Sequence, residues 1–243
     1  MIPKKNSLKT ISTVKKLNFS HPATIGGSNR GNVYVGRLHF KDGAKTRVAI
    51  KTFHNGLSTE TAKAYQKVIN DLISAGIPLP KMGMALIPAG TKIGDFKIPT
   101  REWVQVSQLF GSTKKGSKLV WKSHLELSHK EEKEDAAKMF GKVANLGYSP
   151  TIDFIEPFRH KTGIVPIDID LLVERKENTP KDKMETLSKT LRRMCKTKEE
   201  YRKLTIIALR QLSIEKRKLA RQKFLERIEN WEKEHHLTNS MKV

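Results

Sequence analysis

The stretch that decides the fold runs from Thr24 to Phe53 and reads TIGGSNRGNVYVGRLHFKDGAKTRVAIKTF. Apolar and polar residues alternate over 32–40 and again over 47–53, which is the pattern of half-buried β-strands. Between them, Lys41-Asp42-Gly43 is typical of a turn. The stretch therefore predicts antiparallel strands joined by short connections.

Two motifs in this stretch indicate a phosphate-binding function. Gly26–Val33 fits the pattern G-x-G-x-x-G-x-V, except that Ser28 stands at the middle glycine position. Further on, Val48–Lys51 reads V-A-I-K, and a lysine on an apolar strand is costly to bury without an anion. A phosphate partner would explain Lys51. The alternatives are glycines that only make a turn and an edge-strand lysine that points to solvent.

These motifs, in this order, resemble the protein-kinase-like superfamily over about Thr24–Val173. The resemblance implies an α+β, two-lobed fold with a mostly antiparallel sheet in the first lobe and a reduced helical second lobe. It implies ATP and Mg²⁺ as cofactors, with Lys51 on the α- and β-phosphates and Gln105–Gly111 as the hinge beside the adenine. The positions that match the family's nucleotide-binding residues are Gly26, Gly27, Ser28, Gly31, Val33, Ala49 and Lys51.

Helix signals and charge divide the rest of the chain. Ser58 or Thr59 can cap a helix that runs to about Ala75, and the apolar spacing of Lys130–Leu146 predicts a second. From Pro180 onward the sequence is helical and charged. We expect a basic arm over 1–20, a sheet lobe over 21–111 and a second lobe over 112–243, of which 151–173 form a hairpin and 180–243 a basic tail. The tail's expected apolar stripe consists of Leu204, Ile207, Leu212, Leu219, Leu225, Ile228 and Trp231.

Three carboxylates in the hairpin are the candidate metal ligands. The resemblance puts Asp168 at the position of the aspartate that binds Mg²⁺. Asp168 and Asp170 are two residues apart, so on a strand both would project to the same side. Folding the hairpin about 159–163 brings Asp153 opposite them, where the family keeps a second ligand. An exposed acidic pair that faces lysine or arginine is the alternative.

The catalytic base is the missing part of the resemblance. Counting back five residues from Asp153 arrives at Tyr148, and the chain has no H-R-D motif. At neutral pH a tyrosine cannot accept a hydroxyl proton as an aspartate does. In a different register Asp153 is itself the base and Asp170 a metal ligand. We therefore assign Lys51, Asp153 and Asp168 as the candidate catalytic residues.

Composition limits the possible partners. The 243 residues carry a net charge of +22, which attracts polyanions, so an acidic protein or non-specific nucleic acid is a possible partner besides the nucleotide. No apolar run approaches the roughly 18 residues of a membrane span. Cys195 is the single cysteine, which excludes an intramolecular disulfide. These features predict an intracellular, cytoplasmic protein.

Three functions follow as hypotheses. The first is an ATP-dependent phosphotransferase that acts on a protein serine or threonine or on a small-molecule hydroxyl. The second is a pseudokinase-like module that binds nucleotide or protein without phosphoryl transfer. The third is a basic nucleic-acid-binding protein.

Overall fold

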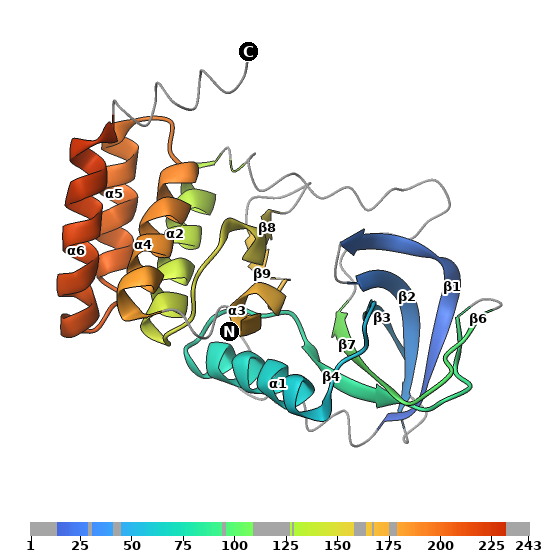
Figure 1. Cartoon of the computed structure of the whole chain (residues 1–243). Helices are drawn as coiled ribbons and strands as arrows, with labels where there is room; N and C mark the ends of the chain where they lie inside the picture. Colours follow the sequence, from blue (N-terminus) through green and yellow to red (C-terminus); the bar gives the residue numbers. More distant parts are fainter. Residues whose placement is uncertain are drawn as a thin grey trace, which may run out of the picture. The chain divides into compact units, whose positions relative to one another are not determined.

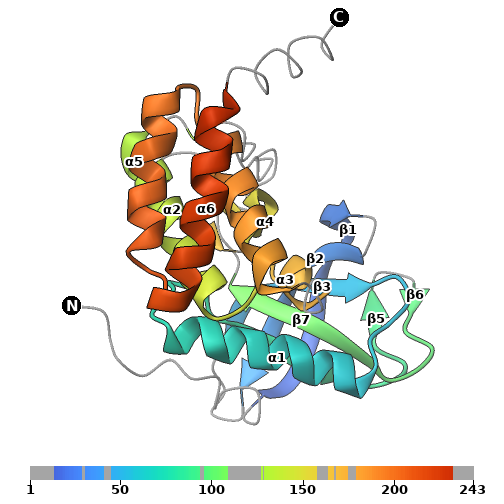
Figure 2. The ribbon, with the colours of Figure 1, turned by 60° about the vertical axis from the view of Figure 1, so that its left-hand side comes forward.

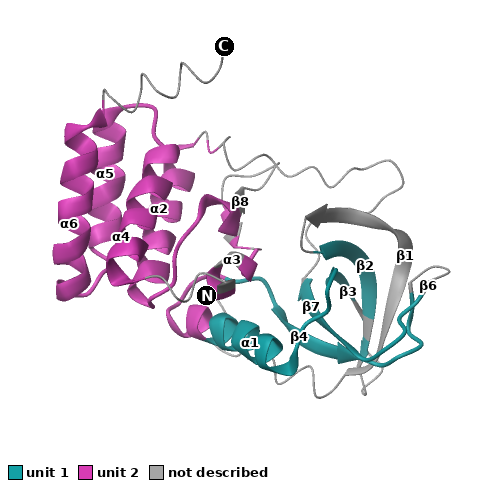
Figure 3. Ribbon diagram, viewed as in Figure 1, with its two compact units in different colours: residues 1–70, 79–119 teal, residues 71–78, 120–243 magenta. Residues whose placement is uncertain are grey.

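The computed structural model describes residues 14–28, 31–40, 45–93, 96–108, 127, 129–157, 164–166, 168–174 and 179–231. Within these ranges the fold is α+β, as the sequence predicted, and the chain divides into two compact units (Figures 1 and 3). Unit 1 comprises residues 1–70 and 79–119, and unit 2 comprises residues 71–78 and 120–243.

Unit 1 is built on an antiparallel sheet, which has five strands in the described residues, in the order β1-β2-β3-β7-β4. The strands are β1 (Val14–Ser28), β2 (Gly31–Phe40), β3 (Lys45–Phe53), β4 (Met82–Ile87) and β7 (Glu102–Gln108). The short strands β5 (Lys92–Ile93) and β6 (Phe96–Lys97) form a separate hairpin. The alternating pattern of 24–53 thus forms the predicted strands, and β3 lies in the centre of the sheet.

The first strand is longer than the sequence indicated. It begins at Val14 and pairs with β2 as far as Val14↔Phe40, so residues 14–20 belong to the sheet and not to a basic arm. Pairing supplies the reason, because the backbone groups of 14–20 find partners along β2 although the local sequence is too basic to read as a strand. Residues 1–13 lie outside the described residues.

One face of this sheet forms a compact apolar core. Alternate residues of the strands point to it, since side chains on a strand alternate between faces. It consists of Val48, Ile50, Ile87, Ile98, Val104 and Val106. The opposite face therefore carries the other set of alternate residues, Lys51 among them.

Helix α1 (Thr59–Ser74) follows β3. The hydroxyl of Ser58 accepts a hydrogen bond from the Thr61 N–H at 3.1 Å, which is the predicted cap. At the other end Gly76 adopts a φ of +67°, a conformation that favours glycine, and the helix stops before it. Both ends of this helix could be predicted from local sequence.

Unit 2 contains a bundle of four helices (Figures 1 and 2). These are α2 (Lys130–Asn145), α4 (Pro180–Arg193), α5 (Lys198–Leu209) and α6 (Ile214–Glu229). Helix α2 packs against α4 and α5, and α6 packs against both of them in turn. The tail after Pro180 is therefore helical as predicted, and its apolar side chains are covered by one another and by α2.

The inward side of α6 differs from the prediction. Ala220 and Phe224 are buried, whereas Leu219 and Leu225 are 41% and 58% exposed. Phe224 packs edge-on against Tyr201 of α5, with ring centroids 6.0 Å apart. Leu219 and Leu225 therefore do not belong to the apolar stripe, because the aromatic residue determines which side of the helix faces inward.

The remaining elements of unit 2 are short. They are the 3₁₀ helix η3 (Ile152–Phe154), the strands β8 (Ile155–Pro157) and β9 (Ile164–Pro166), and the helix α3 (Asp170–Glu174). β8 and β9 pair antiparallel, so the predicted hairpin exists, but its ladder is much shorter than 151–158 paired with 164–173. No helix among the described residues is long and apolar enough to cross a membrane.

Candidate functional site

Lys51 lies half-buried on the central strand β3. Its cross-strand partners are Val33 on β2 and Gln105 on β7, and Ala49 pairs with Val35 in the same way. Residues directly opposite one another in an antiparallel pair share a face of the sheet. The structure therefore brings Lys51, Ala49 and Val33 together on one face, as the predicted nucleotide site requires.

Aromatic side chains continue this face toward α1. The Lys51 Nζ lies 5.9 Å from the centroid of the Phe53 ring, within the range of a cation–π contact. Phe53 in turn packs edge-on against Tyr65 of α1, with centroids 5.5 Å apart. The Lys51 ammonium thus lies beside one aromatic ring, Phe53, which is itself packed against α1. It differs in this from an edge-strand lysine that extends into solvent.

Two polar side chains of α1, Gln66 and Asp71, form hydrogen bonds with other parts of the chain. The Gln66 Oε1 accepts a hydrogen bond from the Met84 N–H at 3.1 Å, and the Gln66 Nε2 donates to Asn70. The two acidic residues of the helix are Glu60, which is exposed in the first turn, and Asp71, which accepts a hydrogen bond from the Tyr148 hydroxyl at 2.6 Å. The Gln66 amide of this helix therefore binds the edge strand β4, and the Asp71 carboxylate binds the Tyr148 hydroxyl.

Gln105 lies in a strand and not in the hinge that the sequence predicted. It was expected in a hinge over 105–111, but it lies in the middle of β7 and is only 4% exposed. Its Oε1 has no hydrogen-bond partner among the described residues. The available signal was a glutamine between two valines on a strand, which indicates that Gln105 points to the opposite face from Val104 and Val106. The pairing of β7 with β3 makes this the face of Lys51.

The glycine motif forms the predicted hairpin. Gly26 pairs with Val33, Gly27 with Asn32 and Ser28 with Gly31, while residues 29 and 30 lie outside the described residues. A Cβ atom at Gly31 would lie 1.8 Å from the Thr52 carbonyl oxygen. Close approach of β2 to β3 therefore requires a glycine at this position even without a ligand.

The three candidate metal ligands adopt three different environments. Asp153 is exposed in η3, Asp168 is half-buried beyond the end of β9, and Asp170 is completely buried at the start of α3. The expectation that Asp168 and Asp170 project side by side from a strand is wrong. The strand ends at Pro166 and the chain turns into a helix, so the alternation of a strand does not apply to them.

A pair of carboxylates is still consistent with the hairpin. In the β8–β9 ladder Ile155 pairs with Pro166, so Asp153 and Asp168 follow the same end of the ladder, each two residues beyond it. Within the described ranges no group of three or more histidine, cysteine, aspartate or glutamate side chains could hold a metal ion. Asp153, Asp168 and Asp170 therefore do not form one three-ligand site, and the ladder places Asp153 and Asp168 at its same end.

The segment before Asp153 contains buried hydroxyl groups. Ser149 is 0% exposed, and its Oγ has no hydrogen-bond partner in the part of the chain that the structure describes; the same holds for the Thr151 Oγ1. The Pro150 carbonyl between them accepts a hydrogen bond from Thr190 of α4 at 3.0 Å. Helix α4 thus holds the backbone of this segment, while two buried hydroxyls remain available to a donor or acceptor.

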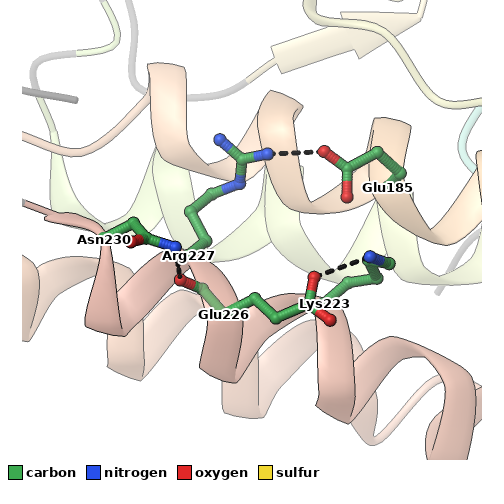
Figure 4. A pocket seen from close by; sticks show the side chains of 5 residues that line it. All are labelled: Glu185, Lys223, Glu226, Arg227 and Asn230. Carbon is green, nitrogen blue, oxygen red and sulfur yellow. Dashed lines mark hydrogen bonds and ion pairs between the residues drawn. The ribbon is translucent and has the colours of Figure 1, made fainter. Parts of the chain in front are cut away.

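A polar hollow lies on the helix bundle of unit 2 (Figure 4). It is lined by Glu185, Lys223, Glu226, Arg227 and Asn230. The Arg227 guanidinium contacts the Glu185 carboxylate at 2.7 Å, and the Lys223 ammonium contacts the Glu226 carboxylate at 2.6 Å. The first pair joins α6 to α4 and the second lies within α6, so these charges neutralise one another and the hollow is not assigned as a binding site.

Cys195 has no features of a reactive cysteine. Burial raises the pKa of its thiol to about 12, and the Sγ donates to the Leu191 carbonyl at 3.1 Å. It is a packing residue of the bundle.

The comparisons with known proteins add no family. No protein-family model matches the chain, and no curated protein is similar enough in sequence to count as a relative. The function of the protein therefore has to be inferred from the geometry within each of the two units.

Proposed function

We propose that this protein is an ATP-dependent phosphotransferase of the protein-kinase-like kind. The observation that supports the proposal best is the position of Lys51. It lies half-buried at the centre of an antiparallel sheet, and Ala49 and Val33 lie on the same face. A long cation beside small apolar side chains suits a ligand that has both a flat ring and phosphates.

The residues present fit an adenine nucleotide. Val33 and Ala49 would contact the base, and the Lys51 ammonium would bind phosphate oxygens as a point charge. The β1–β2 hairpin, with Gly26 and Gly27 on β1, would lie along the phosphates, where a Cβ would keep the backbone away.

Carboxylates of unit 2 would hold the metal. Asp168 and Asp153 supply the oxygen ligands that Mg²⁺ prefers. When bound, Mg²⁺ neutralises charge that develops on the phosphates. The acceptor would be a protein or small-molecule hydroxyl: its oxygen forms the new bond to the γ-phosphorus as the bond to the β–γ bridging oxygen breaks. Asp153 is exposed and can take the hydroxyl proton, in which case Asp168 is left as the metal ligand.

A nucleotide-binding module without transfer is the second candidate, and Tyr148 favours it. Tyr148 stands at the position of the expected base, but its hydroxyl donates to Asp71 at 2.6 Å. A phenol that is already a donor to a carboxylate is not a proton acceptor at neutral pH.

Binding of ATP tests both candidates together. ATP with Mg²⁺ at a hundredfold excess over Kd should stabilise the protein by about 2.7 kcal/mol, measured as a rise in the melting temperature. Lys51→Ala should remove most of that rise. Lys45→Ala, an exposed lysine on the same strand, is the matched control and should keep it. An equal rise in the Lys51 and Lys45 variants would contradict the proposal.

Appearance of ADP then separates the two candidates. A phosphotransferase should release ADP from ATP in the presence of Mg²⁺ and a hydroxyl acceptor such as a serine- and threonine-containing protein. Asp168→Asn should abolish this release. A protein that is stabilised by ATP but forms no ADP would be the binding module.

A further inference from the structure

The side-chain amide of Gln105 is buried, and its oxygen accepts no hydrogen bond from the described residues. The residue is 4% exposed, and within the described residues no donor reaches its Oε1. Buried side-chain oxygens in proteins are nearly always hydrogen-bonded, because a buried acceptor without a donor loses its hydration and gains nothing in return. The side chain therefore indicates a donor that arrives in another state of the protein.

The sheet register identifies the nearest cation. Gln105 is the direct cross-strand partner of Lys51, and on its other side it pairs with Met84 of β4. Opposite residues of an antiparallel pair have Cβ atoms about 4.5–5.5 Å apart, well within the reach of a lysine side chain. Met84 offers no hydrogen-bond donor in its side chain, so of the two cross-strand partners Lys51 is the one that can donate.

Gln66 provides an internal comparison. It is the glutamine of α1 beside the same strand β4, and its Oε1 accepts a hydrogen bond from the Met84 N–H at 3.1 Å. One glutamine near this face is thus a structural link between helix and sheet, while the other keeps a free acceptor opposite the lysine. Two glutamines in one fold with such different roles can be tested with the same substitution.

We propose that Gln105 is the positioning residue for Lys51. Its Oε1 accepts a hydrogen bond from the Lys51 Nζ and so directs the ammonium toward the phosphates of a bound nucleotide. An amide is neutral, so it orients the cation without cancelling its charge, and the full positive charge stays available to the phosphates. The inference rests on the proposed function, because it names the residue that prepares the same site.

Two carboxylates of α1 and β7 differ from Gln105 in their exposure or in the face on which they lie. Glu60, in the first turn of α1, is exposed. Glu102 lies on β7 three residues before Gln105 and so on the other face of the strand, where burial raises the pKa of its carboxyl.

Two substitutions of Gln105 test the proposal in the full-length chain. Gln105→Leu removes the acceptor at similar size, and we expect it to weaken binding of a non-hydrolysable ATP analogue with Mg²⁺ about tenfold by calorimetry. Its melting temperature without nucleotide should stay the same or rise, because a buried acceptor without a donor is lost. Gln66→Leu is the matched control and should lower the melting temperature, since it breaks the bond to the Met84 N–H.

A second readout tests, without nucleotide, whether the two side chains lie within reach of each other. Gln105→Glu should raise the pKa of Lys51, followed by NMR of labelled lysine and assigned with Lys51→Arg, because a carboxylate opposite the ammonium favours its charged form. An unchanged Lys51 pKa in this variant would overturn the proposal, and so would a Gln105→Leu protein that binds the analogue as tightly as the unaltered chain. A protein that binds no nucleotide but shows the pKa rise would refute the proposed function and leave only the proximity of Lys51 and Gln105 supported.

Discussion

The sheet face of unit 1 and the helix bundle of unit 2 bury different kinds of polar side chain. In the bundle, charged side chains pair across helices: the Lys133 ammonium of α2 contacts the Glu200 carboxylate of α5 at 2.6 Å, and Arg227 of α6 contacts Glu185 of α4. On the sheet face, Gln105 keeps an amide oxygen without a partner among the described residues. Ion pairs therefore connect the helices of the bundle, whereas the buried polar group opposite Lys51 is a neutral amide.

The difference also shows where the positive charge serves a structural purpose. The Arg192 guanidinium stacks 3.5 Å above the centroid of the Trp231 ring, and Arg227 also donates to the Ser188 hydroxyl at 2.9 Å. Cations of the helical tail are thus partly used to hold helices together. A share of the +22 net charge belongs to the packing of unit 2 and requires no polyanionic partner.

The largest effect should come from removal of the tail helices. A chain that ends at residue 179 lacks α4, α5 and α6, and α2 then exposes Phe140, Val143 and Ala144, which are completely buried in the intact protein. We expect the thermal transition of unit 2 to disappear and helical circular dichroism to fall by more than the deleted residues account for. A truncated protein in which α2 stays helical and unfolds cooperatively would show that the bundle is not one unit.

Substitutions at neighbouring positions of α6 should separate its buried and exposed sides. Phe224 is 1% exposed, so Phe224→Ala should lower the free energy of unfolding by about 3–5 kcal/mol. Leu225 is 58% exposed, and Leu225→Ala should change that free energy by no more than about 0.5 kcal/mol. Chemical denaturation measures both. Similar losses in the two variants would restore the stripe that the sequence pattern predicted.

Breaking the Lys133–Glu200 ion pair should destabilise the bundle by a comparable amount. Glu200→Ala leaves the Lys133 ammonium buried without its carboxylate, which should cost about 3 kcal/mol of the free energy of unfolding. The double variant Lys133→Met with Glu200→Ala is the control and should recover most of the loss. If the double variant is as unstable as the single one, the pair is not the cause.

The same pair predicts a dependence of stability on pH. Burial alone would raise the pKa of Glu200, but hydrogen bonds from Lys133 and from the Lys196 N–H outweigh it and hold the pKa below its ordinary value of 4.5. A carboxyl with a lowered pKa in the folded state stabilises the protein above its unfolded pKa. This contribution should therefore be complete above about pH 4.5 and be lost as the pH falls through the folded pKa. Glu200→Gln should flatten the curve of stability against pH in that range.

Loss of the Tyr148 hydroxyl should have a smaller effect on folding than loss of the buried ion pair. Tyr148→Phe breaks the hydrogen bond to Asp71, and a hydrogen bond to a charged group contributes about 1.5–3 kcal/mol. Because Asp71 is only half-buried and can be hydrated, we expect about 1.5 kcal/mol or less by denaturation. ADP release should be unaffected if Tyr148 is structural. A variant that folds normally but forms no ADP would instead make the tyrosine part of the catalytic machinery.

Much of the fold was predictable because its signals are local. The alternation over 24–53 produced the hairpin and the lysine strand, and the Ser58 cap and Gly76 set the two ends of α1. In the same way, the Thr179 hydroxyl accepts a hydrogen bond from the Asp182 N–H at the start of α4, where the sequence places a threonine before Pro180. Periodicity and caps depend on residues at most four positions apart, so they can be read without the rest of the chain.

The predictions that were wrong concern features that depend on contacts between residues far apart in the sequence. Pairing with β2 extended β1 back to Val14, and Phe224 chose the inward side of α6 through its contact with Tyr201. The turn of the chain into α3 buried Asp170, whereas Asp168 before the helix is half-buried. None of these outcomes has a local signal, because burial depends on which surface another element covers.

The candidate site divides along the same line. Its residue types, a lysine on an apolar strand and carboxylates on a hairpin, could be recognised from the sequence alone. The neighbour of Lys51 could not, because β7 follows β3 only after a helix, β4 and a small hairpin, yet it pairs directly with β3 in the sheet. Strand order is decided by which edges come together during packing, and that order placed the buried acceptor of Gln105 opposite the lysine.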